Sequence, residues 1–188
     1  MEMATRVNGK KRLKPGLPHL RTTPDALPRF LAPENIQLFE TYKVLNEKEV
    51  HARYIAKAEQ YAKLLNIEAN TMSYMCRHMY LPALIDYSGK IAQGLISKKQ
   101  LGIKARSEEA LLIGLTEGID EISDSVELVE RLNTKAHGIQ DVSIQDRAYL
   151  DDVIPAMRRL RVAVDKMEKV CSHEAWPVPT YNKILFYV

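Results

Sequence analysis

The sequence predicts an all-α protein, an elongated bundle of long, proline-kinked antiparallel helices that ends in an extended tail rich in proline and aromatic residues. Three observations support this fold class. The chain has only 8 glycines in 188 residues, and the helix formers Leu, Ala, Glu, Lys and Met are abundant. Apolar residues recur at alternating spacings of three and four, which is the repeat of a helix face. Two closely spaced prolines in "WPVPT" forbid helix near the end of the sequence.

Residues 1–21 form a basic lead-in. They hold six Lys and Arg residues against one acid, so the segment carries +5 and the rest of the chain −2, for a net charge of +3. We expect a solvated, disordered segment, although a basic arm can also contact nucleic acid or an acidic lipid surface. It lacks the apolar stretch of a secretory signal, and no apolar run approaches the roughly 20 residues that span a bilayer. We therefore expect no membrane association and a cytoplasmic location.

The next segment, "TTPDALPRFLAPENIQLFETYKV", predicts two short helical turns. Thr23 suits the N-cap of the first turn, with Pro24 at its N1 position. Pro33 suits N1 of the second turn for the same reason, because the missing N–H of proline costs nothing at a helix start.

A long helix is predicted after Asn46, which forms a capping-box pattern with Glu49. Pro82 should kink or break this helix near Tyr80, because proline removes a backbone hydrogen bond. A second helical segment then runs from Pro82 to about Lys99, and Gly102 is the expected stop. The predicted seam of the first segment is interrupted by one acid, Glu68, and comprises Tyr54, Ala58, Tyr61, Leu65, Met72, Met75 and Met79.

Two further helices are predicted to form an antiparallel hairpin. The first starts at Ser107 and carries the seam Leu112, Leu115, Ile119, Ile122, Val126 and Val129. Gly138 turns the chain, and a final helix, bent at Pro155, runs to about Cys171. Its seam comprises Leu150, Val153, Met157, Leu160, Val164, Met167 and Cys171. These elements define a predicted helical bundle domain over residues 22–173.

Residues 174–188, "EAWPVPTYNKILFYV", predict an extended tail. Pro177 and Pro179 restrict their own backbone and that of the residues before them, so helix should not continue past Glu174. The tail is too apolar to remain in water without consequence. We therefore expect it to dock on the bundle with Trp176 as its anchor. The alternative is that it lies against another protein domain and is exposed in this chain alone.

Residue patterns for catalysis or metal binding are weak. The five histidines form no HExxH or Glu-x-x-His pattern, and the glycines form neither a dinucleotide-binding fingerprint nor a phosphate-binding loop. Cys76 and His78 lie close together but lack further ligands, so a helix-face position is expected for His78. Cys76 and Cys171 are expected to be buried, reduced thiols. We predict no catalytic, cofactor-binding or metal-binding residue in this chain.

Glu68 is the most unusual single residue, because it is an acid on an apolar seam. Such a group must be paired, lie exposed at the edge of the bundle, or have a shifted pKa. An ion pair with Arg158, Arg159 or Arg161 is favoured over a catalytic role. The stripe Met72, Met75 and Met79 is expected to be adaptable core packing and not a ligand groove.

Five stretches resemble the C-terminal region of type III glutamine synthetases, in the order found in that family. They cover roughly residues 20–188 and read "LRTTPDALPRFLAPENIQLFETYKVLNEKEVHARY", "NIEANTM", "LPALIDYSGKIA", "VIPAMRRLRVAVDKMEK" and "WPVPTYNKILFYV". The resemblance implies a helical domain of an enzyme that makes glutamine from glutamate, ammonia and ATP. That chemistry uses ATP and Mg or Mn on a β-rich catalytic domain, and no part of this chain resembles that domain. No catalytic residue of the family is therefore assigned here.

The resemblance implies a non-catalytic domain with a structural or assembly role in nitrogen metabolism. Its expected partners are a glutamine synthetase catalytic domain or further copies of itself in a homo-oligomer. An alternative is a free-standing helical adaptor or nucleic-acid-associated bundle that uses the cluster Lys10–Lys14. Nucleic acid is the less expected partner.

Overall fold

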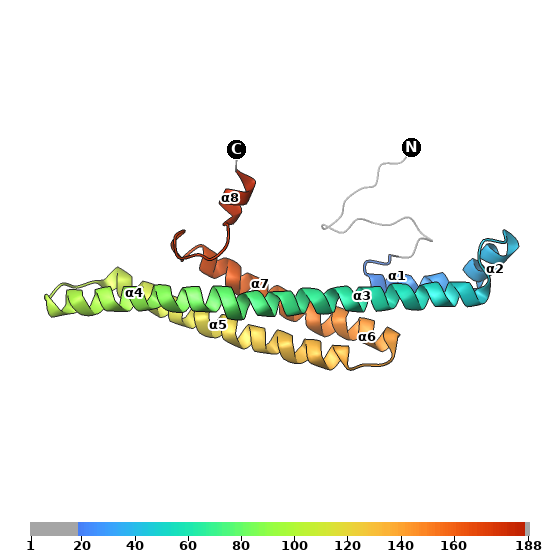
Figure 1. Ribbon diagram of the computed structural model, residues 1–188, viewed down its shortest axis with the longest axis horizontal. Coiled ribbons are helices and arrows are strands. Elements are labelled where there is room, and N and C mark those ends of the chain that lie inside the picture. The colour runs from blue at the N-terminus through green and yellow to red at the C-terminus, as the bar shows by residue number, and fades with distance from the viewer. Residues whose placement is uncertain (1–18, 187–188) are drawn as a thin grey trace. The chain divides into compact units, whose positions relative to one another are not determined.

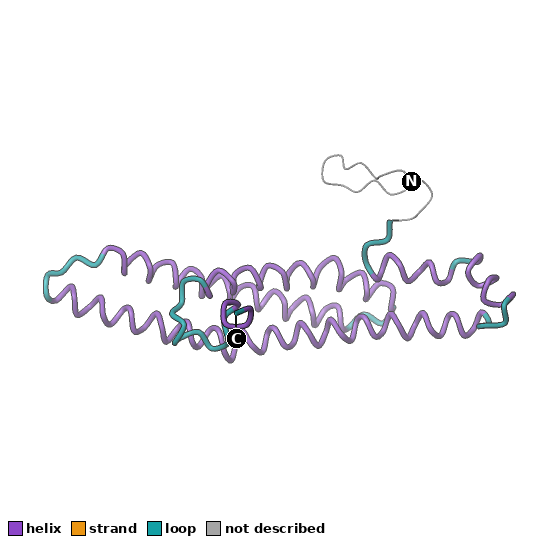
Figure 2. The backbone as a smooth tube through the Cα atoms, turned by 90° about the horizontal axis from the view of Figure 1, so that it is seen from above, coloured by secondary structure: helices purple, strands orange, loops and turns teal. Residues whose placement is uncertain are grey.

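The computed structural model describes residues 19–186, and within that range it contains helices and loops but no strand (Figure 2). The predicted all-α class is confirmed. Most of the predicted lead-in, including Lys10–Lys14, lies outside the described residues, as does Val188 of the predicted tail. The chain divides into two compact units, residues up to 58 and residues from 59 onward, which are described separately.

The described part of the first unit contains short helices followed by the start of a long one. These are α1 (Thr23–Ala26), the 3₁₀ helix η1 (Leu27–Leu31), α2 (Pro33–Thr41) and the first residues of α3 (Glu47–Met75). The N-cap of α1 is Thr22, whose hydroxyl accepts from the Asp25 N–H at 3.3 Å. The prediction of Thr23 as cap was therefore wrong by one residue, and Pro24 occupies the second helical position. Pro33 begins α2 as predicted.

The capping box at the start of α3 is confirmed. The Glu49 N–H donates to Asn46 Oδ1 at 3.0 Å, and the Asn46 N–H donates to Glu49 Oε2 at 2.8 Å. Each side chain therefore satisfies a backbone donor that the helix leaves without a partner.

Three long helical segments pack side by side in the second unit (Figure 1). The first comprises the later part of α3, the π-helical η2 (Cys76–Tyr80) and α4 (Leu81–Gln100). The second is α5 (Arg106–His137), and the third comprises α6 (Val142–Ala148), the π-helical η3 (Tyr149–Val153) and α7 (Ile154–Glu168). Helix α5 runs antiparallel to both neighbours and contacts α4 and α7. The predicted hairpin of the last two long segments is confirmed.

Both internal prolines are accommodated by the same local device. Pro82 and Pro155 each stand at the second position of an α-helix that directly follows a five-residue π-helical stretch. The Leu81 N–H donates to the Cys76 carbonyl and the Ile154 N–H to the Tyr149 carbonyl, five residues back instead of four. The wider π turn accommodates the missing donor and the bulk of proline. The expected break near Tyr80 is therefore absent, and helix continues without interruption from Glu47 to Gln100.

The turn between α4 and α5 is fixed by Gly102, which has a φ of +72°. The Gly102 N–H donates to the Lys99 carbonyl at 3.0 Å and the Ile103 N–H to the Lys98 carbonyl at 2.9 Å. These two bonds are the Schellman arrangement that ends helices, as the glycine predicted. Helix α5 begins at Arg106 after Ala105, one residue before the predicted start at Ser107.

The core lies mainly between α5 and the η3–α7 segment. From α5 it takes Leu115, Ile122, Val126 and Val129, all fully buried, and from the opposite helix Val153, Leu160 and Met167. Helix contact is close at Gly118, where an added Cβ would overlap the Met167 side chain. Tyr149 is fully buried, while its neighbour Leu150 is only half-buried. The buried residue at this point of the seam is therefore Tyr149, one residue before the predicted Leu150.

The C-terminal tail differs from the prediction in its second half. Helix α7 ends at Glu168, and residues 169–180 lead irregularly to a short helix, α8 (Tyr181–Leu185). The extended conformation expected over residues 174–188 is therefore wrong for α8. Proline cannot donate a helical hydrogen bond, but Thr180 follows the last proline and its carbonyl accepts from the Ile184 N–H at 3.1 Å. Helix can resume there.

Candidate binding groove

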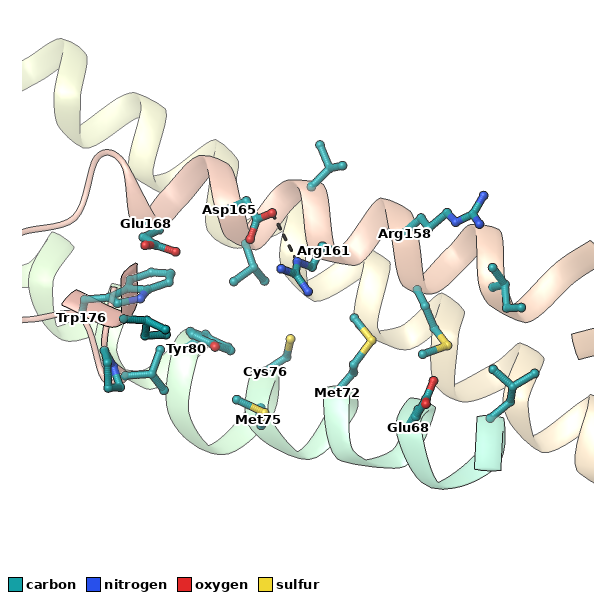
Figure 3. A pocket seen from close by; sticks show the side chains of 18 residues that line it. Glu68, Met72, Met75, Cys76, Tyr80, Arg158, Arg161, Asp165, Glu168 and Trp176 are labelled. Carbon is teal, nitrogen blue, oxygen red and sulfur yellow. Dashed lines mark hydrogen bonds and ion pairs between the residues drawn. The ribbon is translucent and has the colours of Figure 1, made fainter. Parts of the chain in front are cut away.

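A groove with a volume of about 920 Å³ lies within the second unit, between the C-terminal part of α3 and α7. Helix α3 and η2 supply one wall, α7 supplies the other, and the tail closes one end (Figure 3). Its lining residues are Leu65, Glu68, Met72, Met75, Cys76, Tyr80, Ile154, Met157, Arg158, Arg161, Val162, Val164, Asp165, Glu168, Trp176, Val178, Pro179 and Ile184. Most of these side chains are apolar or amphipathic.

The closed end of the groove is built from aromatic rings. Trp176 is only 5% exposed, and its ring lies 5.1 Å from that of Tyr80, centroid to centroid, at 38°. This distance is typical of a favourable aromatic pair. Burial also raises the pKa of Tyr80. The Trp176 Nε1 donor and the Thr180 hydroxyl are buried without a hydrogen-bond partner among the described residues.

The α3 wall is formed by methionines at the edge of the buried seam. The seam itself comprises small or branched residues, Ala62, Leu65, Ala69 and Cys76. Met72 and Met75 lie beside it and are half-buried, with one side on the groove. Met72 packs against the core cluster as expected, but the expectation that the stripe does not line a groove was wrong at Met72 and Met75. A flexible thioether suits an apolar surface that must adapt to its contact.

Charged groups occupy the rim of the groove. Arg161 Nε donates to Asp165 Oδ2 at 3.3 Å along α7. Glu68 is exposed on the α3 edge, and Arg158 extends away from it (Figure 3). Within residues 19–186 no ion pair joins Glu68 to an arginine of the last helix. The favoured ion pair was therefore wrong, and the exposed-edge alternative describes Glu68.

The two cysteines are buried and free, as predicted. Burial raises the pKa of the Cys76 thiol to about 11, which Arg77 opposes and Glu130 reinforces. The thiol is therefore protonated at neutral pH and is a poor nucleophile. Arg77 itself makes a two-pronged contact to Glu130 of α5, at 2.6 and 2.5 Å. His78 is exposed and stacks on Tyr74 at 4.6 Å between ring centroids, consistent with a helix-face position.

A second polar site lies away from the groove, at Asp146 of α6. This carboxyl is 3% exposed, and its Oδ1 lacks a hydrogen-bond partner among the described residues. Burial raises its pKa to about 6. The nearby Tyr61 hydroxyl also has a raised pKa, first because of burial and then because of Asp146 and Asp151. Sequence reasoning missed Asp146, although it falls three residues before Tyr149 on the buried seam.

Comparison with known proteins finds a family model that matches the first half of the chain. A model described as "Glutamine synthetase C-terminal domain" matches residues 8–99, which include the α3 wall of the groove. Residues 8–99 are therefore similar to the glutamine synthetase C-terminal domain family. The later segments, which form α5, α7 and α8, extend beyond the matched range.

Three glutamine synthetases match nearly the whole chain. A glutamine synthetase of Butyrivibrio fibrisolvens is 28% identical over 175 residues, and a type-3 glutamine synthetase of Dictyostelium discoideum is 29% identical over 178. A third, from Bacteroides fragilis (strain YCH46), is 23% identical over 178 residues. These matches cover 92%, 91% and 91% of this chain but only 25%, 24% and 24% of the relatives. The chain spans about a quarter of the length of the curated relatives it matches.

The described residues do not fit the divalent metal ions that a full-length glutamine synthetase implies. Within residues 19–186 no three His, Cys, Asp or Glu side chains converge as a metal site would require. Helices that are both long and apolar enough to cross a membrane are also absent from that range.

Proposed function

We propose that this chain is a non-catalytic helical domain with a structural and assembly role in a type III glutamine synthetase. It would act in the cytoplasm, packed against a catalytic region that makes glutamine from glutamate, ammonia and ATP. The activity would belong to that region, with ATP and Mg or Mn bound there.

The observation that carries this proposal is the uncovered apolar surface of the second unit. The groove is lined largely by Met, Leu, Val and aromatic residues, and beside it Ile184, Leu185 and Phe186 are exposed. Contiguous apolar surface of this kind marks contacts between proteins. The similarity to glutamine synthetases that are four times longer supplies the kind of partner.

Reconstitution tests the proposal directly. The chain would be mixed with a type-3 glutamine synthetase from which the matching quarter has been removed. We expect a complex in sedimentation experiments that persists at high salt, because apolar docking depends little on ionic strength. We also expect no glutamine formation by the chain alone. Glutamine formation without the catalytic region would overturn the proposal, and so would failure of a folded chain to bind that region.

The alternative nucleic-acid role uses Lys10–Lys14, which the structure does not describe. Binding to labelled DNA or RNA separates the two hypotheses, because affinity for phosphates falls steeply with salt. Salt-sensitive binding that is lost when these lysines are replaced by glutamine would favour the alternative.

A further inference from the structure

Two apolar surfaces that the described chain leaves exposed lie together on the second unit. One is the groove between α3 and α7. The other is α8, where Ile184, Leu185 and Phe186 are 64%, 71% and 75% exposed. Ile184 also lines the groove, so the two surfaces are continuous. Each therefore offers what the other needs, an apolar cleft and an apolar helix.

The α8 of the same chain is too short to fill the groove. The groove wall on α7 runs from Ile154 to Glu168, and fifteen helical residues extend roughly 22 Å. Helix α8 has five residues and extends roughly 7.5 Å. Thr180, directly before it, is buried and fixes its start at the Trp176 end. Helix α8 of the same chain can therefore reach only that end.

The charges of α8 and of the groove rim also favour binding of α8 from another copy. The stretch from Tyr181 to Phe186 has one charged residue, Lys183, which is exposed. Arg158, Arg161 and Asp165 also line the groove, and Asp165 is paired with Arg161, whereas Glu68 on the α3 edge has no ion pair within residues 19–186. A lysine entering with α8 would find a carboxylate on the α3 edge. Opposite charges at such a rim set orientation more than affinity.

We infer that the groove is the docking site for α8 of a second copy of this chain. Leu185 and Phe186 of one copy enter the groove of the other, and Lys183 faces Glu68. A two-fold axis makes the exchange reciprocal, so that each α8 is buried and covers part of the partner's groove that the partner's own α8 does not reach. The inference goes beyond the proposed function, since it concerns copies of this chain and needs no catalytic region.

The first test measures the mass of the complete chain by sedimentation over a range of concentrations. We expect a concentration-dependent dimer, and we expect Phe186→Asp and Leu185→Asp to weaken it at least tenfold, because each buries a charge in the apolar groove. Ile113→Asp is the matched control, since Ile113 is equally apolar and exposed on α5 but does not line the groove. It should leave the dimer unchanged.

Exchanging the two charges tests whether Lys183 of one copy faces Glu68 of the other. Glu68→Lys and Lys183→Glu should each weaken the dimer about twofold to fivefold, as expected for a pair at an exposed rim. The double variant should restore it. Both residues are exposed, so neither variant should change the helical circular dichroism signal, which separates loss of docking from loss of folding.

Three results would overturn the inference. They are a wild-type chain that stays monomeric at every concentration, a dimer indifferent to the α8 variants, and a double charge variant no better than the single ones. None of these bears on the proposed function, because they are measured without a catalytic region. Because the dimer and a catalytic region would use the same groove, binding to a catalytic region is measured at concentrations where the chain is monomeric. Failure to bind there would contradict only the proposed function.

Discussion

The two sides of α7 are built from the same helix and have opposite properties. Towards α5, Leu160 and Met167 are almost completely buried, and Gly118 lets the two helices approach closely. Towards α3, Val162 and Arg158 border a groove that the described chain leaves open. The α5-facing side, called the finished side below, is fully packed within the fold. The α3-facing side, called the unfinished side, is left partly open.

The difference follows from side-chain size along the facing helices. Helix α5 buries Leu115, Ile122, Val126 and Val129 on this side, and Met167 of α7 fills the space beside Gly118, so the two helices are closely packed. The buried seam on the α3 side comprises Ala62, Leu65, Ala69 and Cys76, of which only Leu65 is large, and methionines lie at its edge. This comparison predicts that substitutions on the α5 side act on stability, whereas those on the α3 side act on association.

Trp176 is an exception on the unfinished side, because it is buried within the chain and closes one end of the groove. Trp176→Ala removes the ring that packs on Tyr80 and should cost about 3 to 5 kcal/mol of unfolding free energy. It is the only tryptophan, so its fluorescence reports this site alone. We expect blue-shifted emission protected from quencher in the wild type. Red-shifted, freely quenched emission would contradict the packing seen here.

Substitutions on the finished side of α7 should have the next largest effect on the free energy of unfolding. Ile122→Ala or Leu160→Ala should each cost about 2 to 5 kcal/mol in urea unfolding, because each leaves a cavity between α5 and α7. Glu127→Ala on the exposed side of α5 should cost less than about 0.5 kcal/mol. Equal costs at these positions would mean that the α5–α7 interface is not the stabilising one.

Asp146 should act in the opposite direction, as a buried acid that weakens the fold. Its pKa of about 6 lies above the ordinary value of 3.8, so the folded state binds the proton more tightly than the unfolded state. Its contribution to stability therefore rises as pH falls from about 6 to 4 and is least favourable above 6. Asp146→Asn should stabilise the protein by about 1 to 3 kcal/mol at pH 7 and flatten this dependence.

Urea unfolding at several pH values measures the effect of Asp146→Asn. The exposed neighbour Asp151 supplies the control, since Asp151→Asn should change stability by less than about 0.5 kcal/mol. Equal stability of wild type and Asp146→Asn at every pH would contradict the assignment.

Much of the fold could be predicted from the sequence because its signals are local. The Asn46–Glu49 capping box, the glycine at 102 and the seam from Leu115 to Val129 each depend on residues a few positions apart. A break at Pro82, one of the two predicted outcomes there, was wrong for a physical reason. Proline excludes a normal α-turn, but a sequence pattern does not show whether the chain will break or widen into a π turn, as before Pro82 and Pro155.

The groove could not be predicted, because it depends on the distance between two helices that are far apart in sequence. Met72 and Met75 fit a helix seam equally well whether the facing residue touches them or stands back. Glu68 was correctly singled out as unusual, but its exposure depends on where α7 lies. The resumption of helix at α8 was missed because the two prolines outweighed the residues after them.

The smallest expected effect on stability gives the sharpest test of the unfinished side. Val162 lines the groove and is mostly exposed, so Val162→Ala should change unfolding free energy by less than about 0.5 kcal/mol. The same change removes apolar surface from the proposed contact with α8 and should weaken dimerisation measurably. Ile113→Ala on α5 removes a similar exposed surface outside the groove and should alter neither quantity. Loss of stability at Val162, or unchanged dimerisation there, would show that the two sides of α7 do not divide stability and association as we infer.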